Sequence, residues 1–144
     1  MSRTIDANVL VYASDAESPH YERAQEILGR LAEGPDLVYL FWPVVMAYLR
    51  VVTHPGVFVD PLQPSMAREN ISDLVNRPHI RLVAEGRRFW DLYREVTDAV
   101  PVRGNLVHDA HIVALMREHG VRTIWTRDRD FRKFDGIEAI DPFV

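Results

Sequence analysis

A chain of 144 residues with 47% hydrophobic and 26% charged side chains has the length and composition of one globular domain with a substantial core. It contains no cysteine, which excludes disulfides and thiolate metal sites and leaves oxygen and imidazole as metal ligands. The formal net charge of -4 does not exclude a nucleic-acid partner, because acids gathered at a metal site would be neutralised by the ion. No run approaches the roughly 20 apolar residues of a membrane span. The N-terminus also lacks a signal-peptide pattern, so we expect a cytoplasmic protein.

The first apolar stretch carries Asp6 and Asn8 and continues as Val-Leu-Val-Tyr-Ala over 9–13. If this stretch is a single strand, Asp6 and Asn8 lie on the same face, because side chains two apart on a strand point the same way. The alternative is that Asp6 caps a helix that begins at Ala7. A chain that turns after Asp6 also allows both polar side chains to line one pocket at the end of the strand.

Beyond this stretch, helical apolar spacing and short apolar runs alternate along the chain. Helices are predicted over 19–32, 44–53, 65–76, 87–100 and 106–119, with a possible cap at Asn105 before the last of them. Strands are predicted over 37–41, 80–83, 123–126 and 138–140, and 127–134 is predicted as a polar loop or short helix. This alternation predicts an α/β fold: an α/β/α sandwich with a mostly parallel central sheet, in a single domain over 1–144.

Carboxylates recur where the predicted strands end. Asp6 lies on or just after the first strand, Asp109 lies near the start of the helix over 106–119, and Asp128 follows the strand over 123–126, with Asp130 two residues later. In such folds, sites form beyond the carboxyl ends of the strands. Acids gathered there repel one another unless a hard cation such as Mg²⁺ or Mn²⁺ holds them. The structural alternatives are a helix N-terminus that favours Asp109, and ion pairs or solvent for the later two.

Five arginines flank these acids in the sequence and are candidates for phosphate contacts, because the planar guanidinium matches phosphate oxygens. A solvated position on a helix or loop face is an equal alternative for each of them. They are Arg50, Arg103, Arg127, Arg129 and Arg132.

Taken together, these segments resemble the PIN-domain nucleases, and among them the VapC-type ribonuclease toxins of bacterial toxin–antitoxin modules. The resemblance runs along essentially the whole chain, and each segment alone is weakly specific. The segments that carry it, in the family's order and spacing, are Asp-Ala-Asn-Val-Leu over 6–10, Leu-Arg-Val-Val-Thr-His-Pro over 49–55, Asp-Ala-His-Ile-Val-Ala over 109–114 and Thr-Arg-Asp-Arg-Asp-Phe over 126–131.

The resemblance implies an endoribonuclease that depends on Mg²⁺ or Mn²⁺ and cuts RNA with metal-activated water. Asp6, Asp109 and Asp128 would be the metal ligands or would lie directly behind them. The resemblance also implies a homodimer and a small VapB-like antitoxin whose C-terminal segment enters the acidic site. The same resemblance implies a hetero-oligomer of this chain and the antitoxin that binds operator DNA.

Three further positions take supporting roles in the catalytic site that the resemblance implies. Asn8 and Thr126 would orient ligands or waters through hydrogen bonds, and Asp130 would be an auxiliary acid.

The chain departs from the family at Ala47, because the family places a Glu immediately before the segment that begins at Tyr48. No Asp or Glu occurs between Asp36 and Asp60, so a shift in alignment does not restore the acid. We expect activity to be absent or lowered by about 10–100-fold. A natural member with a weakened site is one explanation, and a substitution introduced to spare the expressing cell is the other, favoured because the other motifs are intact. The rival function is a non-catalytic member that binds RNA or the antitoxin.

Overall fold

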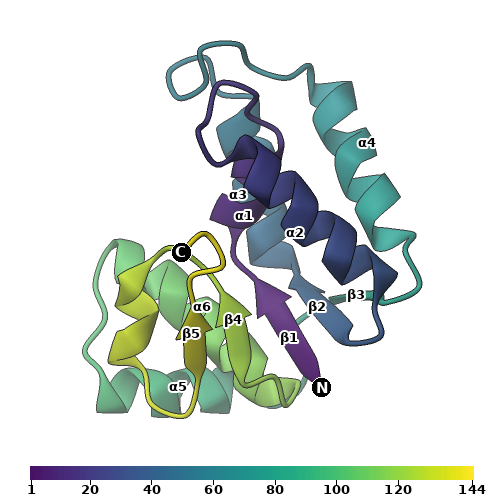
Figure 1. Ribbon diagram of the computed structural model, residues 1–144. Coiled ribbons are helices and arrows are strands. Elements are labelled where there is room, and N and C mark those ends of the chain that lie inside the picture. The colour runs from purple at the N-terminus through teal and green to yellow at the C-terminus, as the bar shows by residue number, and fades with distance from the viewer.

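Five parallel strands form the central sheet of the computed structural model, which describes residues 1–144 (Figure 1). The sheet order is β3-β2-β1-β4-β5, and every neighbouring pair is parallel. The prediction of a mostly parallel sheet is therefore confirmed, with no antiparallel member. The strands are β1 (Ser2–Ile5), β2 (Leu37–Phe41), β3 (Ile80–Val83), β4 (Thr123–Trp125) and β5 (Glu138–Ile140).

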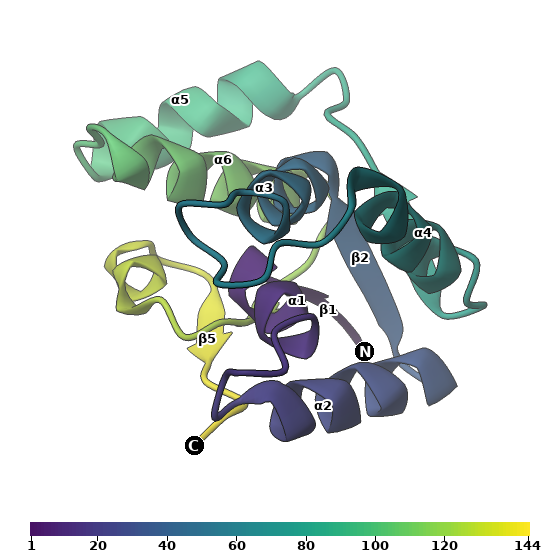
Figure 2. The ribbon, with the colours of Figure 1, turned by 90° about the horizontal axis from the view of Figure 1, so that it is seen from above.

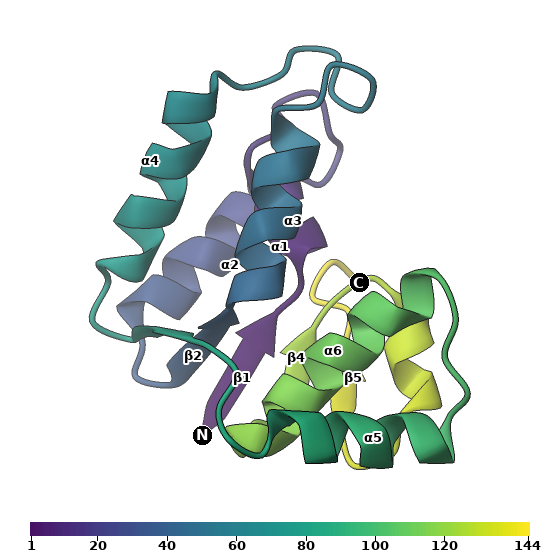
Figure 3. The ribbon, with the colours of Figure 1, turned by 180° about the vertical axis from the view of Figure 1, so that it is seen from behind.

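Six α-helices and one short 3-10 helix connect and cover these strands. Figure 2 shows α2 on one side of the sheet and α5 and α6 on the other, which confirms the α/β/α sandwich. The helices α1 and α3 extend beyond the carboxyl ends of β1 and β2 (Figure 3). The helices are α1 (Ala7–Ala13), α2 (Tyr21–Glu33), α3 (Trp42–Val52), α4 (Pro64–Val75), α5 (Phe89–Ala99), α6 (Asn105–Glu118) and the 3-10 helix η1 (Arg129–Lys133).

The N-terminal stretch is not one strand, so Asp6 and Asn8 do not share a strand face. β1 ends at Ile5, and Asp6 is the N-cap of α1, with its Oδ1 accepting a 2.8 Å hydrogen bond from the Ala7 N–H. Val9, Leu10 and Ala13 are buried at helical spacing, so the apolar run packs better as a helix. The alternative in which Asp6 caps a helix is the correct one.

Two other element boundaries differ from prediction for local reasons. Ser18 does not cap a helix that begins at Pro19; its Oγ accepts from the His20 N–H within a turn, and α2 begins at Tyr21. The N-cap of α6 is Gly104, with φ of +56°, rather than Asn105. Only glycine adopts that left-handed conformation without strain, which places the helix start one residue earlier than expected.

The core lies between the sheet and the helices, and α6 is its most buried helix. Residues 109–116 of α6 are almost all buried, because the helix lies between the sheet and α5. That burial includes Asp109, only 4% of which is exposed. A carboxylate in such a position needs a compensating partner, since burial of an unpaired charge is costly. No helix of the structure has the length and hydrophobicity needed to cross a lipid bilayer.

Candidate metal centre

The strand order reverses beside β1, and this reversal places the candidate site. From β1 the chain proceeds through β2 to β3 on one side, whereas β4 and β5 lie on the other. Ligands of open parallel sheets bind at such a reversal, beyond the carboxyl ends of the strands. Asp6 directly follows β1 and Thr126 directly follows β4, and the Asp6 N–H donates to the Trp125 carbonyl at 3.0 Å.

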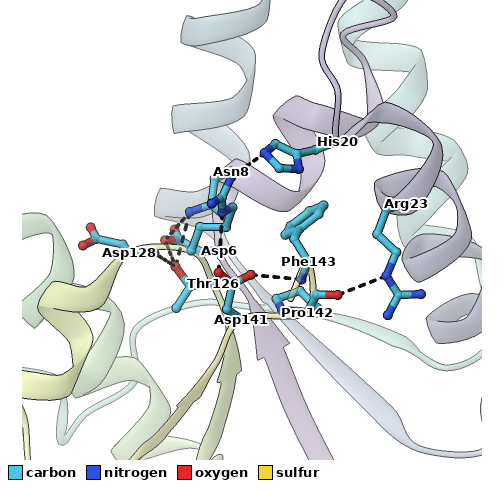
Figure 4. Close-up of polar contacts among 10 residues, drawn as sticks. Asp6, Asn8, His20, Arg23, Thr126, Asp128, Asp141, Pro142 and Phe143 are labelled. Carbon is cyan, nitrogen blue, oxygen red and sulfur yellow. Dashed lines mark hydrogen bonds and ion pairs between the residues drawn. The ribbon is translucent and has the colours of Figure 1, made fainter.

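The hydroxyl of Thr126 connects three of the predicted site residues (Figure 4). It donates a 2.7 Å hydrogen bond to Asp6 Oδ2 and accepts one of 2.9 Å from the Asp128 N–H. Asn8 Nδ2 donates to the same hydroxyl at 3.3 Å and to Asp6 Oδ2 at 3.4 Å. The residues that begin α1 and those that follow β4 are therefore held as one polar cluster.

A second group of acids lies on this side of the sheet, beyond the carboxyl ends of the strands. Carboxylate oxygens of Asp109, Asp128 and Asp130 all lie within 4.8 Å of one another. Asp109 comes from the second turn of α6, and Asp128 caps η1 by accepting a 2.9 Å hydrogen bond from the Asp130 N–H. Lys133 lies 3.2 Å from Asp130 and neutralises part of that charge.

The grouping of the acids differs from the set that the resemblance implies, which is Asp6, Asp109 and Asp128. Asp130 joins Asp109 and Asp128 in the close group, whereas Asp6 contacts that group through Thr126.

The electrostatics of this edge favour a cation. Burial, reinforced by the negative charges of Asp128, Asp6 and Asp130, raises the pKa of Asp109 to about 7. Burial also raises the pKa of Asp6, although hydrogen bonds from Thr126 and Ala7 act in the opposite direction. Both shifts mean that the protein neighbours do not fully offset the cost of burying these carboxylates in their ionised form.

The residues present fit a hard divalent cation. The acids at this edge and the amide of Asn8 offer carboxylate and amide oxygens, the type of ligand that Mg²⁺ and Mn²⁺ prefer. In addition, Asn8 Oδ1 is buried and has no hydrogen-bond partner. A buried acceptor without a donor is uncommon in folded proteins, and here it identifies a place for a water or hydrated ion.

Ala47 lies half-buried on α3. That helix contacts α1 and α6, which carry Asn8 and Asp109. The helix that would provide the family's second acid is thus next to the helices that form the site.

Contacts made by Arg127 were not anticipated from the sequence. Its guanidinium hydrogen-bonds to His20 Nε2 and lies 3.5 Å from an oxygen of Asp141. Figure 4 shows these two partners, His20 and Asp141, near the polar cluster. His20 in turn packs against Tyr12 and Phe143, with ring centroids 4.9 and 5.2 Å away. These residues come from distant segments, so no local pattern in the sequence indicates the arrangement.

Comparison with known proteins agrees with this fold. The family model for the PIN domain matches residues 4–137, and the chain belongs to the PIN domain family. Among curated proteins, it is 55% identical over 143 residues to Ribonuclease VapC48 of Mycobacterium tuberculosis (strain ATCC 25618 / H37Rv), covering 99% of each chain. It is 33% identical over 140 residues to Ribonuclease VapC37 of the same strain, covering 97% of this chain and 96% of that one.

A solved structure shares the same fold at low sequence identity. VapBC2 from Rickettsia felis, bound to a DNA fragment from its promoter, matches with a TM-score of 0.68 and 14% identity, covering 96% of this chain and 97% of that one.

Proposed function

We propose that this chain is a metal-dependent endoribonuclease toxin of a toxin–antitoxin pair. The observation that carries the proposal is the group of three carboxylates at the reversal of strand order, with Asp6 attached to it through Thr126. The names of the relatives, which describe ribonucleases, support RNA as the substrate.

In the proposed site, Asp6, Asp109 and Asp128 would hold Mg²⁺ or Mn²⁺, either as ligands or from directly behind the ligands. When bound, the ion supplies an activated water and neutralises charge on the scissile phosphate. Asn8 and Thr126 keep the carboxylates in position, because their hydrogen bonds restrict the rotation of Asp6 and the backbone at Asp128. Asp130 is an auxiliary acid whose charge Lys133 partly offsets.

Ala47 weakens this site in the proposed mechanism. A Glu on α3 would add a fourth acid from the helix that contacts α1 and α6. Its absence removes a ligand or water contact, and we expect a loss of about 10–100-fold in metal affinity or activity.

The proposed partners are a VapB-like antitoxin and a second copy of the chain. Complexes such as VapBC2 with promoter DNA support the antitoxin and an assembly on operator DNA. Trp42 and Met46, one turn apart on α3, are 44% and 57% exposed and provide an apolar surface for a homodimer. Large exposed apolar side chains that cluster commonly mark such interfaces.

The proposal is tested by RNA cleavage with the chain as it stands and with Ala47→Glu. We expect the Ala47→Glu chain to cut structured RNA in the presence of Mn²⁺ and to lose this activity in EDTA. The double variant Ala47→Glu/Asp6→Asn is the matched control, because it keeps the new acid on α3 and removes the carboxylate of Asp6, the N-cap of α1. If Ala47→Glu cuts no RNA in a broad panel, the chain is a non-catalytic binding member of the family.

A further inference from the structure

A basic pocket adjoins the acidic cluster on the side of η1 and the C-terminal residues. It has a volume of about 220 Å³, and its lining includes Arg127, Arg129 and Arg132. Thr126 and Asp128 line the same pocket and also belong to the acidic cluster. The two features therefore share a wall, and a chain-like ligand in the acidic site would extend into the pocket. We call it the arginine pocket.

The arginine pocket retains positive charge after its internal pairs are counted. Arg127 is paired with Asp141 at 3.5 Å, and Asp128 faces the acid group around Asp109. Arg129 and Arg132 are exposed and make no ion pair or side-chain hydrogen bond in the structure. Two guanidinium groups are therefore free to bind an anion.

Several contacts hold the wall formed by Arg127. Its guanidinium is held by Asp141 and His20, and Arg23 Nε donates to the Pro142 carbonyl at 3.1 Å, which fixes the adjacent C-terminal segment. Phe143 packs edge-on against Tyr12, with ring centroids 5.3 Å apart. On the Arg127 side of the pocket, little conformational entropy is therefore lost when a ligand binds.

We propose that the arginine pocket binds a backbone phosphate of the RNA, next to the phosphate that is cut. The inference rests on the proposed function and adds the subsite that sets the position of the strand. A guanidinium binds phosphate through two parallel N–H···O bonds, and Arg129 and Arg132 provide this geometry without breaking an existing pair. The adjacent acidic cluster repels phosphate in the absence of a cation, so RNA needs a basic subsite to remain there.

The test measures RNA binding without catalysis, so that its result does not depend on cleavage. A fluorescein-labelled, unstructured 20-nucleotide RNA is titrated with the full chain in EDTA at several NaCl concentrations, and anisotropy gives the dissociation constant. The variant is Arg129→Ala/Arg132→Ala. The matched control is Arg122→Ala. Arg122 is exposed and precedes β4, so it lies at the amino end of that strand, whereas the arginine pocket follows the carboxyl end.

We expect the double variant to bind this RNA about tenfold more weakly, and the slope of log K against log[salt] to become shallower by about 0.7 per lost phosphate contact. Arg122→Ala should leave both quantities unchanged. Unchanged affinity and slope in the double variant overturn the inference. If RNA binding is unchanged and an antitoxin no longer copurifies, the pocket serves an acidic protein segment and the inference is also wrong. Weaker RNA binding by the double variant, together with no RNA cleavage by the Ala47→Glu chain, supports the subsite and contradicts the enzymatic proposal alone.

Discussion

The Thr126 hydroxyl donates a 2.7 Å hydrogen bond to Asp6 Oδ2 across 120 residues of sequence. This bond joins the carboxyl ends of β4 and β1 at the reversal of strand order. Because the same hydroxyl accepts from the Asp128 N–H, it fixes two of the proposed metal ligands relative to each other. Thr126 is therefore a positioning residue, and its effect can be measured.

Thr126→Val removes the hydroxyl and retains the shape of the side chain. The buried Asp6 carboxylate then loses its shortest side-chain hydrogen bond, and we expect the free energy of unfolding to fall by about 1–3 kcal/mol. In the Ala47→Glu background we also expect metal affinity to fall by about 10–100-fold. Chemical denaturation and isothermal titration with Mn²⁺ measure the two effects.

Thr126→Ser is the matched control for this substitution, since it keeps the hydroxyl and removes only a methyl group. It should retain most of the metal affinity. Equal losses in the Ser and Val variants would show that packing, rather than the hydrogen bond, holds this edge together.

Mn²⁺ should raise the melting temperature of the chain as it stands, because three carboxylates within 4.8 Å remain even without an acid at position 47. Binding to the folded state alone adds about 2.7 kcal/mol at an ion concentration 100 times the dissociation constant. For a domain of this size that corresponds to about 5–10 °C. Differential scanning calorimetry measures the shift, and Asp109→Asn/Asp128→Asn should abolish it. An unchanged melting temperature in the unmodified chain would mean that the cluster binds no metal without a Glu at position 47.

Much of this architecture follows from local pattern. Each predicted strand after the first has its counterpart in the sheet, because a short apolar run between turn residues has few other ways to be buried. The positions of Asp6, Asp109 and Asp128 at one edge follow from the parallel sheet, since each acid lies just after a strand or near the start of a helix.

Two features could not be predicted from local sequence pattern: the helix in the first stretch and the arginine pocket. Val9 and Leu10 fit a strand as well as a helix, and the capping bond from Ala7 to Asp6 decides in favour of the helix. The contact between His20 and Arg127 spans 107 residues and depends on how the start of α2 meets the segment that follows β4 in the folded chain. The tertiary packing, which no periodicity describes, creates that contact and the pocket beside it.

The pKa of Asp109 predicts how the stability of the metal-free protein depends on pH. Burial, with the nearby acids, raises this pKa from its ordinary value of 3.8 to about 7, so between these values the folded state binds the proton more tightly than the unfolded state. The protonated Asp109 therefore contributes most to the free energy of unfolding at low pH. This contribution is lost as the pH rises through about 7. The shift corresponds to at most about 4 kcal/mol at pH 8, and with screening by solvent at the open edge we expect about 1–2 kcal/mol.

Asp109→Asn should raise the free energy of unfolding in EDTA by that amount at pH 8 and change it little near pH 4, because the amide imitates the protonated acid. Urea denaturation at several pH values measures the difference between the two chains. Asp98→Asn is the control, since Asp98 is exposed on α5 and is not part of the acidic cluster. An Asp109→Asn chain that is less stable than the unmodified chain at pH 8 would show that the carboxylate is compensated within the protein. The case for a bound cation at this edge would then be lost.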